Sequence, residues 1–215
     1  MAIVIVYLIS VSIPLIIGIY GYRRLKIDMK LLLALIVLAF CVEVLTFCMS
    51  WEKIDTVWVH NIYLPFEYIL IALIFSKWHD NVKFGKLIIY SIPVYILLHI
   101  LSQVRMGDIN QINSFSISLS CTLFVCISAY TLLILLKADI GSIYQDYKFW
   151  ACSALLIYAA GSIAFWAFSK IIISFILYYI FLCVNAVAYF LFAAAFWIHF
   201  KHQLPSAPDS DLRVE

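Results

Sequence analysis

The chain has 215 residues, of which 66% are apolar and only 12% are charged. A soluble globular domain is closer to half apolar and a quarter charged, so this composition excludes one. The apolar excess also excludes a disordered chain, and a net charge of +2 with no basic block excludes a nucleic-acid partner. The composition therefore predicts a protein whose solvent is the lipid bilayer.

Long apolar runs recur along the whole chain, and a membrane-spanning helix needs about 20 such residues. We predict seven spans, at residues 3–22, 31–50, 57–77, 86–104, 112–136, 149–168 and 171–200. The runs are continuously apolar rather than alternating, which favours helices over a transmembrane β-barrel. The last two runs are together too long for one span, so we expect a tight turn near Ser169 and Lys170. The predicted fold is an all-α bundle of seven transmembrane helices (1–200) with a short disordered tail (201–215).

Lysine and arginine are divided unevenly between the two sides of the predicted bundle. Eleven of the fourteen fall on one side. The other side carries three: Lys53, Arg105 and Lys170. Basic loops stay in the cytoplasm, so the N-terminus is expected outside and the C-terminus in the cytoplasm. Trp78 and His199 fall near inner span ends, where we expect Trp78 at the headgroup level and His199 in contact with water or headgroups.

Two of the twelve acidic residues lie within the predicted spans rather than at their ends, namely Glu43 and Glu67. An ionisable group in hydrocarbon costs several kcal/mol, so each is a candidate functional residue. With a rise of about 1.5 Å per residue, Glu43 lies ~10 Å and Glu67 ~15 Å from the outer ends of neighbouring antiparallel spans. Two close carboxyls cannot both ionise easily, which predicts a pair that holds a proton at neutral pH.

The third span carries the polar stretch around Glu67. His60, Tyr63 and Glu67 follow i, i+3, i+7 spacing and share one helix face. Asn61 and Tyr68, seven residues apart, form a neighbouring pair. Together with the apolar residues between them, these side chains predict one wall of a polar pocket.

Three residues complete the predicted site. Pro65 has no N–H and favours a kink, so it is a candidate helix pivot. His99 on the fourth span lies at a depth similar to that of His60. Asn185 on the seventh span, ~21 Å from the outer end, is expected to reach Glu67 from below. The predicted ligand-binding or proton-binding set is Glu43, His60, Asn61, Tyr63, Glu67, His99 and Asn185.

Three interpretations of these polar residues remain open. Buried polar groups also hold membrane helices together, and Glu43 bonded to Tyr63 or His60 would do only that. A ligand or proton site explains them equally well. His60, His99 and the two glutamates form a weaker metal-site pattern, because they come from three helices without a recognised motif. We assign no metal and no cofactor.

Small residues recur along the fifth span. Ser114, Ser118, Thr122 and Cys126 repeat every four residues, and Ser116 with Ser120 does the same. Such repeats are typical of faces on which membrane helices pack closely, so we predict helix contacts there.

The stretch HNIYLPFEY, with Glu43 before it on the second span, resembles a pattern in uncharacterised seven-helix membrane proteins of Bacteroidota. It is also similar to the membrane portion of seven-helix sensor histidine kinases. These resemblances imply a multi-pass protein of the bacterial inner membrane with a signalling role. Pro65-Phe-Glu67 also resembles the Pro-x-Glu-Glu stretch of small heterodimeric lycopene cyclases, although Tyr68 replaces the second acid.

The first functional hypothesis is a membrane sensor or accessory protein. It would bind a small or lipidic ligand, or protons, and signal to a membrane or cytoplasmic partner. The alternatives are a proton-coupled transporter of a small solute and an intramembrane enzyme that acts on a lipid or isoprenoid. No P-loop, GxGxxG, HExxH or GxSxG motif occurs in the sequence, so an enzyme is the less favoured class.

Overall fold

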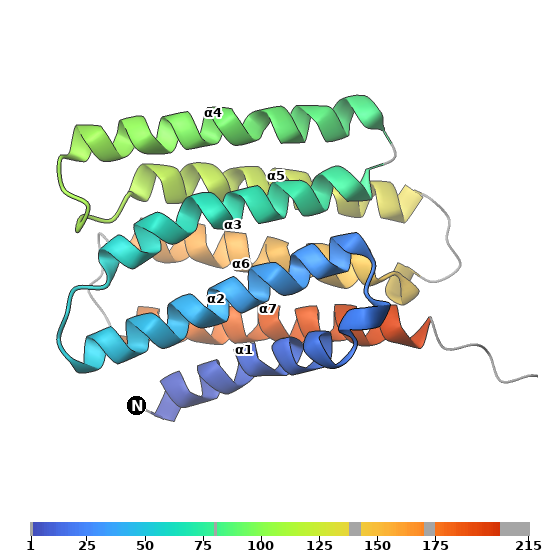
Figure 1. The fold of residues 1–215 in the computed structure, drawn as a ribbon, viewed down its shortest axis with the longest axis horizontal. Helices are drawn as coiled ribbons and strands as arrows, with labels where there is room; N and C mark the ends of the chain where they lie inside the picture. The colour runs from blue at the N-terminus through green and yellow to red at the C-terminus, as the bar shows by residue number, and fades with distance from the viewer. Residues whose placement is uncertain (1, 80, 138–142, 170–174, 203–215) are drawn as a thin grey trace, which may run out of the picture.

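The computed structural model describes residues 2–79, 81–137, 143–169 and 175–202. In these ranges it contains two short 3-10 helices, Tyr22–Arg24 and Ile143–Gln145, and no strand. The α-helices are α1 (Ala2–Tyr20), α2 (Ile27–Trp51), α3 (Val57–Trp78), α4 (Val82–Met106), α5 (Ser114–Lys137), α6 (Tyr147–Ser169) and α7 (Phe175–Lys201) (Figure 1). Helices α2 to α7 are each long and apolar enough to cross a membrane. The chain is therefore an all-α, multi-pass membrane protein.

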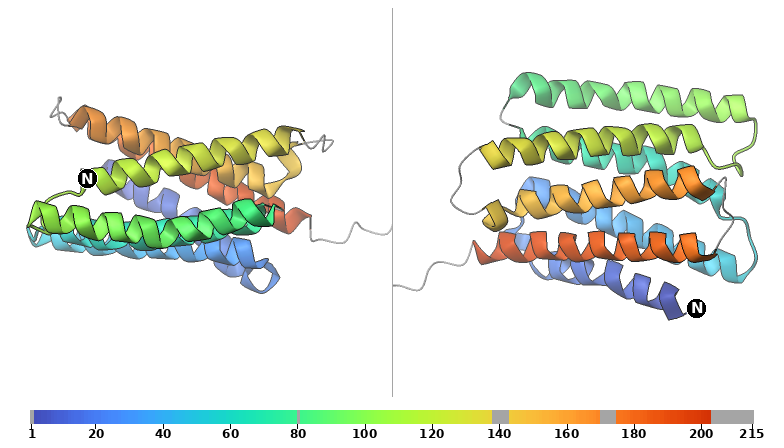
Figure 2. Two further views of the ribbon diagram at one scale, coloured as in Figure 1. Left: turned by 90° about the horizontal axis from the view of Figure 1, so that it is seen from above. Right: turned by 180° about the vertical axis from the view of Figure 1, so that it is seen from behind.

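The helices follow one another around a closed ring. Each packs against the next in the chain, and α7 returns to pack along α1. Seen from above, α2, α3 and α4 form one layer and α5, α6 and α7 the other (Figure 2). Helices α2 and α3 contact each other closely, as do α6 and α7, and α3 also contacts α5. This arrangement leaves the interior of the ring to be filled by side chains.

The helix ends differ from the predicted spans where local backbone chemistry decides them. Helices α2 and α4 each begin four residues earlier than predicted, at Ile27 and Val82. The side chain of Asn81 explains the start of α4, because it accepts hydrogen bonds from the backbone N–H groups of the first turn. Helix α6 ends at Ser169. Lys170, the remainder of the predicted turn, residues 171–174 of the last span and tail residues 203–215 lie outside the described residues.

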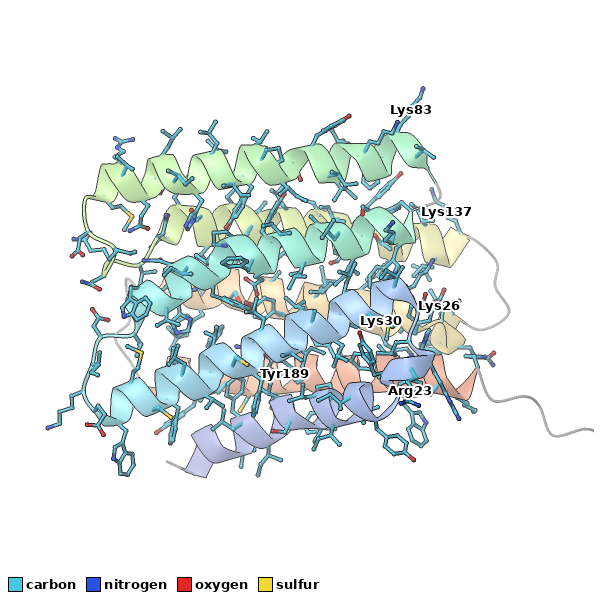
Figure 3. The ribbon with its side chains drawn as sticks, in the orientation of Figure 1. Arg23, Lys26, Lys30, Lys83, Lys137 and Tyr189 are labelled. Carbon is cyan, nitrogen blue, oxygen red and sulfur yellow. The ribbon has the colours of Figure 1, made fainter. Side chains whose placement is uncertain are left out.

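Many of the largest fully buried side chains lie toward one end of the bundle. They come from the first half of α2 and α6 and from the second half of α3 and α7: Met29, Leu32, Ile36, Ile71, Ile74, Phe75, Leu155 and Phe196. Others lie near the middle of their helices, namely Val11, Tyr95 and Phe124. Five basic residues that are labelled in Figure 3 lie at the same end as the first group: Arg23, Lys26, Lys30, Lys83 and Lys137. The basic end of the bundle is thus densely packed.

One prediction at this end was wrong, because His199 does not face water or headgroups. Trp78 ends α3 as predicted, but its side chain is buried in the bundle, and its indole N–H donates to Asp28 Oδ2 at 2.8 Å. The hydroxyl of Tyr147 donates to the same oxygen at 2.7 Å. His199 is buried with its ring edge against Tyr147. The reason is that α2 begins early enough to place Asp28 in its first turn, inside the bundle, where it joins α3 and α6.

Candidate functional site: a polar cavity inside the helix ring

A cavity of about 620 Å³ lies between the α2–α3 pair and the α6–α7 pair, at the end opposite the dense core. Its outer part is lined by residues at the end of α2, the beginning of α3 and the end of α6, which include Ser50, Thr56 and Trp166. From there it reaches inward to Glu67 and Tyr189. Pockets of 300–1,000 Å³ hold small organic ligands, so this cavity is large enough to bind one.

Glu67 lies at the inner limit of the cavity and connects two helices. Its side chain is only 4% exposed. The hydroxyl of Tyr63, one turn earlier on α3, donates to Oε1 at 3.0 Å, and the hydroxyl of Tyr158 on α6 donates to the same oxygen at 2.6 Å. These three residues, together with Tyr189 on α7, form what we call the polar floor. The second carboxyl oxygen, Oε2, accepts no hydrogen bond from the described residues.

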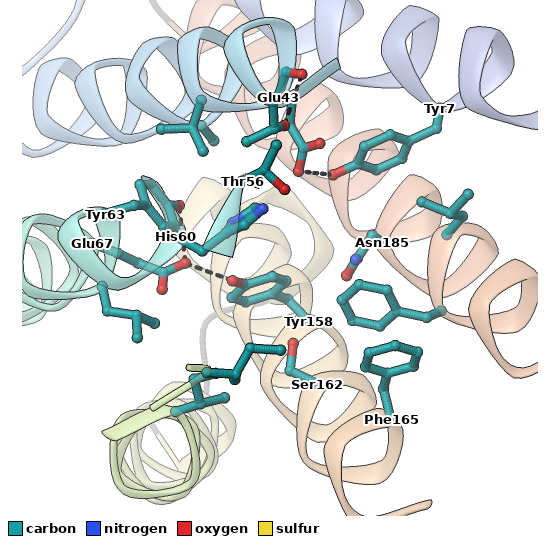
Figure 4. A pocket seen from close by; sticks show the side chains of 18 of the residues that line it. Tyr7, Glu43, Thr56, His60, Tyr63, Glu67, Tyr158, Ser162, Phe165 and Asn185 are labelled. Atoms are coloured by element: carbon teal, nitrogen blue, oxygen red, sulfur yellow. Dashed lines mark hydrogen bonds between the residues drawn. The ribbon is translucent and has the colours of Figure 1, made fainter. Parts of the chain in front are cut away.

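Glu43 lines the same cavity from α2 but does not contact the polar floor by a hydrogen bond. Its Oε1 accepts a hydrogen bond from the hydroxyl of Tyr7 on α1 at 2.9 Å (Figure 4). The expected partners Tyr63 and His60 are therefore replaced by a residue that the sequence did not indicate. The ring of Tyr7 packs edge-on against Tyr189, with centroids 5.9 Å apart. The two glutamates thus share one cavity, but each has its own tyrosine donors.

Asn185 projects from α7 into the same space (Figure 4). It is 3% exposed, and its Oδ1 is buried without a hydrogen-bond partner. The expected contact with Glu67 from below is therefore not made. Asn185 and Glu67 line the same cavity from α7 and α3, but no hydrogen bond joins them. A buried acceptor without a donor costs about 1–3 kcal/mol, so it is a strong indication that something else belongs there.

The sequence motif on α3 divides between two sides of the helix. His60, Tyr63 and Glu67 all line the cavity, as their spacing predicts. Among these, His60 is exposed and forms no hydrogen bond with the described residues. Tyr68 faces α4 instead, where its hydroxyl lies 2.8 Å from that of Ser91. Pro65 stands within the continuous helix α3, two residues before Glu67.

Asn61 is held by contacts with the loop between α4 and α5, and His99 by a contact with the first turn of α5. Asn61 lines the edge of the cavity, but its Nδ2 donates to the carbonyls of Ile109 and Gln111, at 2.7 and 2.8 Å. Its Oδ1 accepts from the backbone N–H of Asn113 at 3.2 Å. His99 does not line the cavity, and its Nδ1 lies 3.0 Å from Ser116 Oγ. The structure therefore does not bring His99 together with the two glutamates.

Sequence reasoning missed the tyrosines that complete the site, namely Tyr7, Tyr158 and Tyr189. A signal was present for two of them, because tyrosine in membrane proteins prefers the interface, and Tyr158 and Tyr189 lie well inside their helices. A buried tyrosine hydroxyl usually has a hydrogen-bond partner. Mid-helix tyrosines in a chain with two intramembrane acids are therefore candidates for their donors.

Comparison of the chain with models of protein families, with curated proteins and with solved structures gave no match. Among the described residues, no group of three or more His, Cys, Asp or Glu side chains is arranged to hold a metal ion. The site offers two carboxyls, tyrosine hydroxyls, one imidazole and the amides of Asn61 and Asn185. These groups can bind and orient a polar molecule inside the bundle.

Proposed function

We propose that this chain is a seven-span protein of the bacterial inner membrane, with its N-terminus outside and its C-terminus in the cytoplasm. Two observations support this topology. Helix α1 packs along both α2 and α7 and completes the ring, as a seventh span would. The labelled lysines and arginine of Figure 3 lie at one end, which the positive-inside rule assigns to the cytoplasm. The cavity then begins on the outer side.

Within this topology, we propose that the protein is a sensor or accessory protein that binds a small ligand in the cavity and signals to a partner. The observation that carries the proposal is the cavity of about 620 Å³ into which the unpartnered Asn185 side chain and both glutamates project. A purely structural polar cluster would satisfy its own hydrogen bonds and leave no such volume. The arrangement favours a binding site over helix packing alone.

A ligand signals only if it prefers one of two arrangements of the protein. Glu67 is a place where a ligand could have such a preference, because the hydroxyl of Tyr158 on α6 donates a hydrogen bond to its Oε1 at 2.6 Å. A ligand that bonds the free Oε2 of Glu67 draws on the same carboxyl that accepts this hydrogen bond, and so changes how α3 and α6 are held together. Pro65, one half-turn before Glu67, weakens the helix at the place where that change would bend it. The altered end of α3 would then be read by the partner.

Native mass spectrometry of the purified full chain tests the binding proposal, because a retained molecule would appear as an added mass. We expect the added mass in the wild type and its loss in Asn185→Phe, which fills the cavity. Val187→Phe is the matched control, since this neighbouring position on the same helix is 48% exposed. A protein that folds and retains nothing from membranes or added extract would contradict the proposal, as would retention that Asn185→Phe leaves unchanged.

One observation favours a transporter as the second candidate. A smaller cavity, of about 30 Å³, lies beyond the polar floor and is lined by Tyr63, Glu67, Tyr158 and Tyr189 from its other side. A floor with a space on each face is what a closed gate would look like. Proteoliposomes loaded with a pH-sensitive dye test this function: solute-dependent proton uptake should disappear in the Glu43→Gln, Glu67→Gln double variant. Absence of any solute-dependent proton movement would argue against a carrier.

A further inference from the structure

We infer that the ligand of the cavity is an organic cation, specifically a protonated amine on an aromatic or aliphatic body. This inference rests on the proposed binding function and names the chemical class of the ligand. It is carried by three features of the cavity wall: the sign of its charged groups, the kind of hydrogen-bonding atom left unpaired and the aromatic faces around them.

The ionisable groups of the wall favour a positive ligand. Glu43 and Glu67 line the cavity, and no lysine or arginine does so among the described residues. An anionic ligand would meet two carboxyls in a low-dielectric interior without a compensating cation, which is unfavourable. A cation placed there would find two carboxyls with which to pair, whereas an anion would find none of the opposite sign.

The hydrogen bonds of the wall favour a donor rather than an acceptor. The hydroxyls of Tyr7, Tyr63 and Tyr158 all donate to glutamate Oε1 atoms, so these donors are already used. Three acceptors have no hydrogen bond from the described residues: Oε2 of Glu43, Oε2 of Glu67 and Oδ1 of Asn185. The lining imidazole of His60 also forms no hydrogen bond with the described residues, and it can either accept or donate one. The Asn185 oxygen is buried and unpaired, so it independently requires a donor. A primary ammonium carries three N–H donors and no acceptor, which matches this set.

The remaining wall suits the body of such a ligand. Phe165 and Phe181 stack with centroids 4.4 Å apart beside the cavity, and Trp166 lies at its outer part. Aromatic faces attract a cation as well as an apolar chain. The wall therefore combines acceptors for an ammonium head with aromatic surface for the rest of the molecule.

Three probes that differ only in their head group test the inference: 4-phenylbutylamine, 4-phenylbutanol and 4-phenylbutanoic acid. Each is titrated calorimetrically into the full chain in lipid nanodiscs, and empty nanodiscs give the blank. We expect saturable binding of the amine, at least tenfold tighter than binding of the alcohol, and no binding of the acid. Glu43→Gln and Glu67→Gln should each weaken amine binding about tenfold or more and leave the alcohol little changed.

Glu52→Gln is the matched control, because Glu52 is an exposed acid at the same end of the bundle that does not line the cavity. The comparison of the three probes on the wild type stands even if a glutamate variant does not fold. Equal binding of amine and alcohol, abolished by Asn185→Phe, would overturn the amine assignment and leave the binding function intact. Preference for the acid, or no binding of any probe, would also overturn it. In the last case the mass of a retained molecule still decides the proposed function.

Discussion

At the scale of residues, the polar stretch of α3 performs two tasks that sequence spacing alone did not separate. One side of the helix supplies the cavity, through Tyr63 and Glu67. The adjacent side holds α4 and the loop that follows it, through Asn61 and Tyr68. Polar residues in a transmembrane helix are therefore not all part of one site. What distinguishes them is whether their hydrogen-bonding groups are already satisfied.

This distinction makes a prediction for Asn61. Its amide forms three hydrogen bonds with the backbone of the α4–α5 loop, each worth about 1 kcal/mol. We expect Asn61→Ala to raise amide hydrogen exchange in residues 107–113, measured by mass spectrometry, and to lower the free energy of unfolding by about 2–3 kcal/mol. Asn110→Ala, in the same exposed loop, should change neither quantity. Unchanged exchange in Asn61→Ala would show that the loop does not depend on this side chain.

Asp28 makes the second prediction at this scale. One carboxyl oxygen accepts hydrogen bonds from Trp78 and Tyr147, so it joins three helices at the basic end. Trp78→Phe keeps an aromatic ring but removes the N–H, which should lower the free energy of unfolding in a detergent titration by about 1–2 kcal/mol. Trp197→Phe is the control, because this tryptophan is 67% exposed. Equal stabilities of the two variants would mean that the Asp28 contact contributes nothing.

At the scale of elements, the sequence predicted where helices occur better than which faces they bury. Every described α-helix overlaps a predicted span, because an apolar run in lipid has to satisfy its backbone internally. Hydrophobicity alone did not predict where α4 begins. Its first residue is determined by the N-cap Asn81, whose side chain accepts hydrogen bonds from the first turn. The small-residue repeats of α5 show the limit for faces. Ser116 and Ser120 are buried as predicted, but Ser118, Thr122 and Cys126 are exposed.

The faces could not be predicted because a membrane helix is apolar all round. Lipid accepts an apolar side chain as readily as a protein interior does, so periodicity carries little information on burial. For the same reason, the sequence did not indicate the hydrogen-bond donors of the two glutamates. Their depth followed from helical rise, whereas Tyr7 and Tyr158 come from helices whose neighbours only the three-dimensional ring defines.

Helix α6 makes a prediction about close packing. A Cβ atom at Gly161 would lie 2.5 Å from Val184 Cγ1 on α7, so a larger residue here would force the Val184 side chain to move. We expect Gly161→Leu to destabilise the protein by about 1–3 kcal/mol through overpacking, measured as the free energy of unfolding. Adding Val184→Ala should recover part of the loss by making room. A double variant as unstable as the single one would contradict direct contact between these two positions.

At the scale of the whole molecule, the bundle is packed at one end and hollow at the other. The packed end carries the labelled basic residues of Figure 3, and the hollow end contains the cavity and both glutamates. This asymmetry fits a protein that receives a ligand from one side and contacts a partner on the other. The proposed function requires that the hollow end face the outside of the cell. Labelling of single cysteines in intact cells can test this orientation.

In a variant without its native cysteines, we expect Lys53→Cys, in the α2–α3 loop, to react with a membrane-impermeant maleimide added to spheroplasts. Lys83→Cys, at the start of α4, should react only after permeabilisation, since it lies at the opposite end of the bundle (Figure 3). Thr56→Cys, which lines the cavity, should be modified by an external aminoethyl thiosulfonate faster than by the sulfonatoethyl analogue, because two carboxyls lie beyond it. Labelling of Lys83→Cys before permeabilisation would invert the topology. Equal rates with the two thiosulfonates would show that the cavity does not discriminate by charge.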